Sequence, residues 1–152
     1  MPAPINQRDY FAEMYVAGVL ADAKWNVYFP RRDQGFDFII TKAISGKIIV
    51  RAVQVKGKYP ESMTASRNAY GYTGDLTQTH EDMVLVIPFF PANGICVAPS
   101  CIAFALWIDI RTNTKGKYFC VPATLKKGIP APRRDFTHMF DAHGLKRIEK
   151  NG

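Results

Sequence analysis

Apolar positions recur at helical spacing near the start of the chain. Between residues 7 and 24 they fall three or four positions apart, which places them along one side of a helix. Asn6 is a suitable N-cap, and Asp9 lies in the expected first turn, where the helix dipole favours a negative charge. The pattern predicts a helix of about five turns. Its apolar positions are Tyr10, Phe11, Met14, Val16, Ala17, Leu20 and Ala21.

Strand patterns follow this helix. Residues 25–29 predict a short strand that ends at Pro30. Residues 36–41 (FDFIIT) and 47–56 (KIIVRAVQVK) are rich in β-branched side chains, and Ser45-Gly46 between them suits a turn. Together these two runs predict an antiparallel hairpin.

The middle of the chain alternates between polar and apolar stretches. Residues 57–81 are polar and contain several glycines, so they predict a long loop with room for a helical piece, of the kind that often carries function. Residues 83–88 (MVLVIP) predict a central strand covered on both faces. Further strand-like runs occupy residues 94–99, 103–110 and 117–121. This order predicts an α/β fold, a central mixed β-sheet flanked by helices.

The last part of the chain, from about residue 124 to 152, is basic and has a short helical pattern near residues 136–148. Seven Lys or Arg face three acids there, which gives +4 of the chain's net charge of +7. We find no repeat or linker, and 152 residues suit a single domain. The basic residues are Lys126, Lys127, Arg133, Arg134, Lys146, Arg147 and Lys150.

Composition narrows the class of protein. The chain is 47% hydrophobic, enough for a packed core, which argues against a disordered protein. A net charge of +7 favours an anionic partner such as nucleic acid, without naming the chemistry. No apolar run is long enough to cross a membrane, and the N-terminal residues lack a signal-peptide pattern, so we expect a cytoplasmic protein.

The cysteines and histidines give no catalytic or metal-binding pattern. Three cysteines, an odd number, lie in apolar surroundings without metal-ligand spacing, which predicts core thiols. The three histidines show neither triad nor zinc spacing, so we assign them no catalytic role. They are His80, His138 and His143.

Polar side chains gather at one end of the predicted hairpin. Asp37 lies at the start of its first strand, and Gln54 and Lys56 lie at the end of its second. These ends are neighbours in an antiparallel hairpin, and alternation puts Gln54 and Lys56 on one face and Val55 on the other. Both faces of residues 47–56 are largely apolar, which predicts a buried strand. The sequence therefore predicts a cluster of Asp37, Gln54 and Lys56.

The order of these residues resembles the PD-(D/E)xK nuclease superfamily. Glu13 lies in the first helix, GFDFII (35–40) follows, and RAVQVKGK (51–58) comes next. Archaeal Holliday junction resolvases and many restriction nucleases have this order: a helix with an acid, a strand with an Asp and a strand ending in acid-x-Lys. The resemblance covers residues 7–58.

The resemblance implies a restriction-endonuclease-like core and a DNA endonuclease that hydrolyses phosphodiester bonds with Mg²⁺ or Mn²⁺. Asp37 would be the primary metal ligand, with the side-chain oxygen of Gln54 and the carbonyl of Val55 as further ligands. Lys56 would position the attacking water or stabilise charge in the transition state. Glu13 would bind the metal directly or would support the residues that bind it.

The sequence departs from the commonest pattern at Gln54, where an acid usually stands. An amide oxygen is a neutral ligand, so the site loses a negative charge, which Glu13 could restore. Such a QxK variant occurs within the superfamily, for instance in restriction enzymes directed at methylated DNA.

Simpler interpretations of the same residues stay open. Asp37 and Lys56 also suit an ion pair that closes a hairpin, and Glu13 also suits a solvent-facing helix position. A DNA-binding or assembly module that kept the nuclease fold but lost cleavage is the main alternative function. An α/β protein unrelated to nucleic acid is the second.

Residues outside the cluster are candidates for DNA contacts and assembly. Duplex cleavage requires two cuts, so we expect a homodimer, the commonest closed symmetry. The apolar run 95–110 suits either its interface or the core. Tyr70 and Tyr72 could stack on bases or pin the loop to the core. The basic candidates for DNA contacts are Lys58, Lys126, Lys127, Arg133 and Arg134.

Overall fold

A five-stranded mixed sheet, here called the main sheet, forms the centre of the protein. The computed structural model describes residues 5–31, 35–92 and 97–150. Within these, the strand order of the main sheet is β1-β2-β3-β5-β6, with β3 and β5 parallel and the other neighbours antiparallel. The fold is therefore mixed α/β, as predicted. The strands are β1 (Asn26–Tyr28), β2 (Phe38–Ile44), β3 (Lys47–Val55), β5 (Val84–Phe89) and β6 (Cys101–Leu106).

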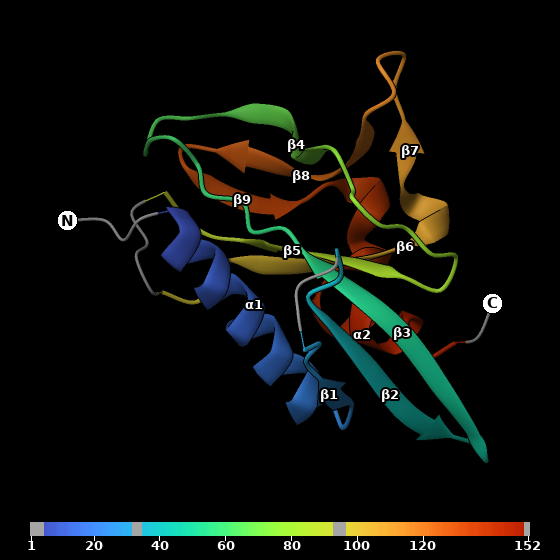
Figure 1. Cartoon of the computed structure of the whole chain (residues 1–152). Coiled ribbons are helices and arrows are strands. Elements are labelled where there is room, and N and C mark those ends of the chain that lie inside the picture. The colour runs from blue at the N-terminus through green and yellow to red at the C-terminus, as the bar shows by residue number, and fades with distance from the viewer. Residues whose placement is uncertain (1–4, 32–34, 93–96, 151–152) are drawn as a thin grey trace.

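Helix α1 (Ile5–Asp22) covers one face of the main sheet (Figure 1). The predicted helix is confirmed, but it begins earlier than expected, so Asn6 lies inside it and Asp9 is in its second turn. Val16 and Leu20 are fully buried and join the core beneath the helix. Lys24 then adopts a positive φ of 76°, which ends the helical path before β1.

The predicted hairpin of β2 and β3 is present. Phe38 pairs with Val53 at its inner end, and Ser45-Gly46 forms the tight turn at its outer end with positive φ at both residues. The expectation that both faces of β3 are buried is wrong for the outer half, where Ile48 is 71% and Val50 52% exposed. The hairpin extends away from the body of the molecule, so no second layer covers this face (Figure 1).

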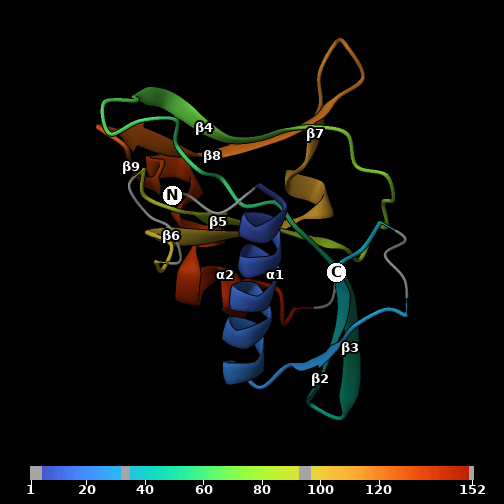
Figure 2. The same cartoon turned by 60° about the vertical axis from the view of Figure 1, so that its left-hand side comes forward.

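A second sheet, here called the upper sheet, covers the other face of β5 and β6. Figure 2 shows these two strands between the upper sheet and the helices. The α-helices therefore flank one face of the main sheet, and strands cover the other face of β5 and β6. Strand β5 is buried along its whole length, as predicted for a central strand. The upper sheet contains β4 (Arg67–Gly74), β7 (Arg111–Thr112), β8 (Tyr118–Lys126) and β9 (Ile129–Pro132).

Strand β4 corrects the expectation of a long loop over residues 57–81. It pairs antiparallel with β8, with irregular register around Tyr70. Gly71, which suggested a loop, lies where a Cβ would come within 2.2 Å of the Cys120 carbonyl oxygen. Glycine is required there by the close approach of two backbones and not by a turn.

The C-terminal part of the chain belongs to the folded body. The 3₁₀ helix η2 (Arg134–Met139) and helix α2 (Asp141–Arg147) pack beside β6. Buried Arg51 of β3 donates from Nε to the Ile148 carbonyl at 2.7 Å and from Nη2 to the Lys150 carbonyl at 2.6 Å. These bonds tie the end of the chain to the main sheet.

Two predicted features of the later chain differ in detail. The strand-like run 103–110 becomes β6 followed by the 3₁₀ helix η1 (Trp107–Asp109). The run 94–99 lies partly outside the described residues, and its described part, 97–99, is not a strand. Among the described helices, none has the length and apolar character needed to cross a membrane.

Candidate active site

Asp37 lies immediately before β2 and is fixed by both its backbone and its side chain. Its N–H donates to the Val53 carbonyl at 2.9 Å. Its Oδ2 accepts a hydrogen bond from the Val55 N–H at 2.6 Å and another from Gln54 Nε2 at 3.2 Å. The pairing of β2 with β3 ends at Phe38. On this side of β3, the carboxylate therefore accepts the hydrogen bond from Val55 that a β2 residue would otherwise accept.

Gln54 is buried, with 8% of its surface exposed. It lies two residues after Ala52, which packs toward the upper sheet, so Gln54 faces the same side. The amide nitrogen, and not the expected oxygen, faces the Asp37 carboxylate. The predicted neighbourhood of Asp37 and Gln54 is therefore present, with Gln54 acting as a hydrogen-bond donor.

Lys56 follows β3 and is half-buried. Its Nζ lies 5.4 Å from the centroid of the Tyr72 ring on β4, a distance at which a cation is attracted to the ring face. The salt bridges between described residues do not include a pair of Asp37 with Lys56. The hairpin-closing ion pair is thus not formed in this structure.

Asp9 of α1 is the acid whose charge interacts with this cluster. Asp9 is exposed, but partial burial of its carboxylate raises its pKa, Lys56 lowers it and Asp37 raises it. The charges of Lys56 and Asp37 therefore act on Asp9. We did not predict this role from the sequence. The signal for it is the spacing of four residues between Asp9 and Glu13, which places both on one side of a helix.

Glu13, the predicted helix acid, lies one turn after Asp9 and is half-buried. The same turn of α1 comes close to the chain where it leaves β3. A Cβ placed on Gly57 would lie 3.2 Å from the Ala12 Cβ and 3.0 Å from the Tyr59 ring. Glycine after Lys56 therefore lets the helix approach the end of β3.

Tyr70 and Tyr72 each carry a lysine over the ring. Lys58 Nζ lies 5.2 Å from the Tyr70 centroid, so two lysines two residues apart meet two tyrosines two residues apart. Tyr70 is only 7% exposed and packs against Phe89, so its ring is not open to a base; it pins β4 to the core. Tyr72 is half-buried, and its hydroxyl donates to the Asp75 carbonyl.

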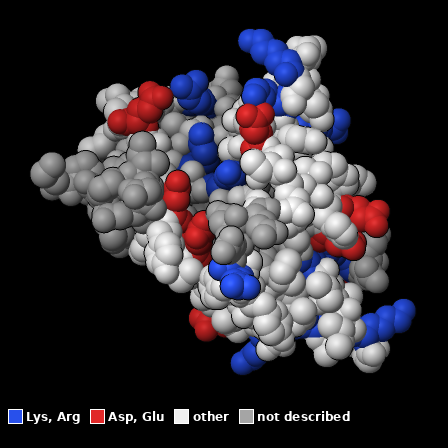
Figure 3. Space-filling model, viewed as in Figure 1, with Lys and Arg blue, Asp and Glu red and all other residues white. Residues whose placement is uncertain are grey.

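The basic candidates of the C-terminal segment divide into two groups. Arg133 serves the fold, because it donates to the Val121 carbonyl at 3.0 Å and lies over the Phe136 ring. Lys126, Lys127 and Arg134 are exposed. Figure 3 shows basic side chains near the middle of the visible face, with acidic side chains beside them.

The donor atoms of the cluster can be compared with the needs of a metal. Among the described residues, no group of three or more His, Cys, Asp and Glu is arranged to hold an ion. Asp37 and Asp9 supply carboxylates and Gln54 an amide, all hard oxygen donors. Mg²⁺ keeps several waters and needs only one or two carboxylates from the protein, so this donor chemistry fits Mg²⁺.

Comparison of the chain with family models, with curated proteins and with solved structures gives no match.

Proposed function

We propose that the protein is a metal-dependent DNA endonuclease of the PD-(D/E)xK type, using Mg²⁺ or Mn²⁺. The observation that carries this proposal is the convergence of Asp37 and Gln54 at the inner end of the hairpin, with Lys56 next to them. Asp9 adds a second carboxylate whose charge interacts with Asp37 and Lys56. The net charge of +7 favours an anionic substrate.

Each residue has a distinct role in the proposed reaction. Asp37 would hold the cation, and the side-chain oxygen of Gln54 and the Val55 carbonyl would be further oxygen donors. Asp9 would add a second carboxylate. Lys56, two residues after Gln54, would supply a positive charge that stabilises negative charge on the phosphate or orients water. When bound, the cation supplies Lewis-acid stabilisation of the phosphate oxygens. Glu13 remains a candidate for a supporting acid.

A restriction-endonuclease-like core is part of the same proposal. What supports it is the order of elements: α1 with its acids, then β2 and β3 with the candidate cluster between their ends, all against one mixed sheet. The upper sheet is an addition to the arrangement that the resemblance implies.

The second candidate function is a DNA-binding or assembly module without cleavage. One observation favours it: Asp37 Oδ2 is already used by the Val55 N–H and the Gln54 amide, so the carboxylate also serves the fold. Loss of the metal would leave these bonds intact.

Calorimetric titration with Mg²⁺, run beside a cleavage assay on linear and four-way DNA, separates the two functions. The nuclease predicts Mg²⁺ binding that tightens in Gln54→Glu, because a carboxylate adds charge to the ligand set, and loss of cleavage in Asp37→Ala. A protein that binds DNA but neither binds Mg²⁺ nor cleaves would support the module.

A further inference from the structure

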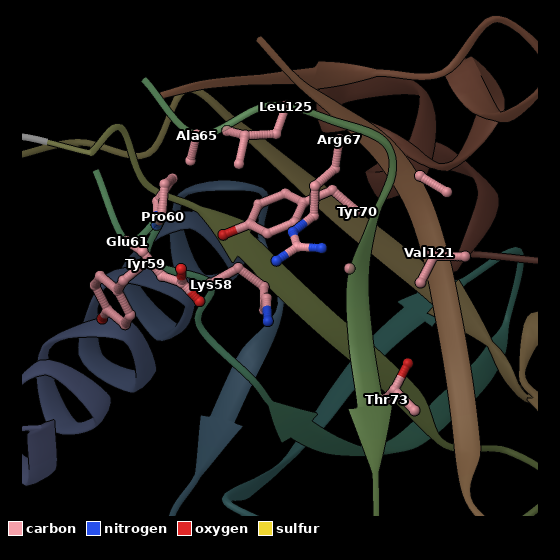
Figure 4. A pocket seen from close by; sticks show the side chains of 12 residues that line it. Lys58, Tyr59, Pro60, Glu61, Ala65, Arg67, Tyr70, Thr73, Val121 and Leu125 are labelled. Carbon is pink, nitrogen blue, oxygen red and sulfur yellow. The ribbon is translucent and has the colours of Figure 1, made fainter. Parts of the chain in front are cut away.

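A cavity of about 300 Å³ opens beside the candidate active site (Figure 4). The segment of residues 58–61, strand β4 and strand β8 surround it. Lys58 and Arg67 extend into this space from different sides, and the Tyr70 ring lies beside the Arg67 side chain. Its size is at the lower end of the range for ligand pockets, about 300–1,000 Å³.

Two positive charges, Lys58 and Arg67, and one negative charge, Glu61, share the cavity. The pKa of Lys58 is lowered by burial and then by Arg67, while Glu61 raises it. Lys58 Nζ also lies over the Tyr70 ring, which holds it toward the cavity. Two like charges facing one space repel each other, and a bound anion would replace that repulsion with attraction to both.

Tyr70 adds a hydrogen-bond donor to the two cations. Burial raises the pKa of its hydroxyl to about 12, so the group stays protonated at neutral pH. Arg67 lowers and Glu61 raises the same pKa, so both charges act at the hydroxyl. An arginine fork, a lysine and a hydroxyl are a suitable donor set for phosphate oxygens.

The position of the cavity relates it to Lys56. Lys58 follows Lys56 by two residues, which in an extended chain is a step of about 6.6 Å. The two lysines lie over the rings of Tyr72 and Tyr70, which are also two residues apart on β4. A nucleic-acid strand that brings one phosphate to Lys56 would therefore bring a neighbouring phosphate to this cavity.

We propose that the cavity binds a phosphate group through Lys58 and Arg67, with Tyr70 as an additional donor. That a DNA strand carries this phosphate rests on the proposed function. The phosphate can come from the end of a strand, from within a strand or from the free ion.

The test measures binding without cleavage, by fluorescence anisotropy with labelled single-stranded oligonucleotides in EDTA. Oligonucleotides with a 5′-phosphate, a 3′-phosphate or no terminal phosphate are compared, and inorganic phosphate is used as competitor at constant ionic strength. The variant Lys58→Met/Arg67→Met removes both cations. Lys47→Met/Arg111→Met, at two exposed positions outside the cavity lining, removes the same charge and serves as the control.

We expect at least a tenfold loss of affinity in Lys58→Met/Arg67→Met and less than a threefold loss in the control. Tighter binding of a phosphorylated end identifies a terminal phosphate, equal binding of all oligonucleotides identifies an internal one, and competition by inorganic phosphate alone identifies the free ion. Equal losses in the two double variants would overturn the site, since only net charge would matter. Arg67→Lys should keep most of the affinity. Thermal unfolding of Arg67→Lys and of Lys58→Met/Arg67→Met shows whether each variant keeps the fold.

Failure of this inference and failure of the proposed function give different results. A protein that loses binding in Lys58→Met/Arg67→Met but never cleaves DNA keeps the phosphate site and contradicts the nuclease. A protein that cleaves DNA with Mg²⁺ and binds equally well in this variant keeps the nuclease and contradicts the site.

Discussion

Asp37 serves the fold and the candidate site with one carboxylate. Its Oδ2 accepts a backbone and a side-chain hydrogen bond at a point where β3 no longer pairs with β2. A residue with both roles cannot be tested by alanine alone, because lost activity could follow from lost structure. Stability and activity therefore have to be measured separately at this position.

We predict that Asp37→Ala lowers the free energy of unfolding by about 1–3 kcal/mol, because the half-buried N–H of Val55 loses its acceptor. Asp37→Asn should cost less, since an amide oxygen can accept the same bond. Urea unfolding measures both, with the exposed Asp22→Ala as a control expected to change by less than about 0.5 kcal/mol. Equal stability of Asp37→Ala and the control would show that these bonds contribute nothing.

The described thiols, Cys101 and Cys120, are buried and free, in agreement with the prediction of core cysteines. Burial raises the pKa of each to about 12, from 9.0. Cys96 lies outside the described residues, so tests of these thiols use a Cys96→Ser background.

We predict that both thiols resist a thiol reagent at pH 8 in the native protein and react fully after denaturation. Because their folded pKa is raised, the stabilisation is present below pH 9 and is lost as pH rises toward 12, by up to about 1.4 kcal/mol per pH unit for each thiol. Urea unfolding from pH 8 to 10 should show a smaller decline in Cys120→Ala than in its parent. Rapid native labelling would contradict the buried placement.

At the level of elements, the hairpin was predictable and the upper sheet was not. Alternating β-branched residues, Ser45-Gly46 and a short separation define β2 and β3 locally, so Asp37 and Gln54 could be placed together. The pairing of β4 with β8 depends on residues about fifty positions apart, such as Tyr72 and Cys120. Gly71 in β4 suggests a loop when only the sequence is considered. Its actual role, the close approach to β8, depends on a strand that is distant in the chain.

Arg51 shows the same limit within a single strand. The local pattern places it in β3, but its acceptors are the Ile148, Lys150 and Asp82 carbonyls, which are far away in the sequence. Nothing near Arg51 in the chain indicates that it is buried and holds the C-terminal segment.

We predict that Arg51→Met lowers the free energy of unfolding by on the order of 3 kcal/mol, because several carbonyl groups lose a charged donor. The exposed Arg111→Met is the control and should change stability by less than about 0.5 kcal/mol. Urea unfolding followed by circular dichroism provides the comparison. A similar small effect for both variants would mean that water replaces the lost bonds.

At the scale of the whole molecule, we predict that the proposed nuclease works as a homodimer, because a chain with one candidate site cuts one strand at a time. Of the two interpretations of residues 95–110, interface or core, the core interpretation holds for β6, since Cys101–Ala105 are buried inside this chain. Light scattering at micromolar concentration should give twice the chain mass of 17.1 kDa. A monomer both with and without DNA would contradict the dimer and leave nicking or single-strand cleavage.

The candidate site was only partly predictable for the same reason as the fold. Asp37, Gln54 and Lys56 could be predicted as neighbours because they lie on two strands of one hairpin. The approach of Asp9 depends on how α1 lies across the sheet, and the partnership of Lys58 with Tyr70 depends on β4. Contacts between layers are set by packing over the whole molecule, which one sequence does not display.

The proposed function requires that the cluster around Asp37 cleave DNA with a divalent cation. The most direct measurement is single-turnover cleavage of labelled duplex by wild type and Asp37→Asn, each with Mg²⁺ and with EDTA, and with Asp22→Asn as the control. We predict that EDTA abolishes cleavage and that Asp37→Asn slows it on the order of a hundredfold while the control stays at the wild-type rate. Full cleavage in EDTA, or an Asp37→Asn rate equal to wild type, would contradict metal-dependent cleavage at Asp37.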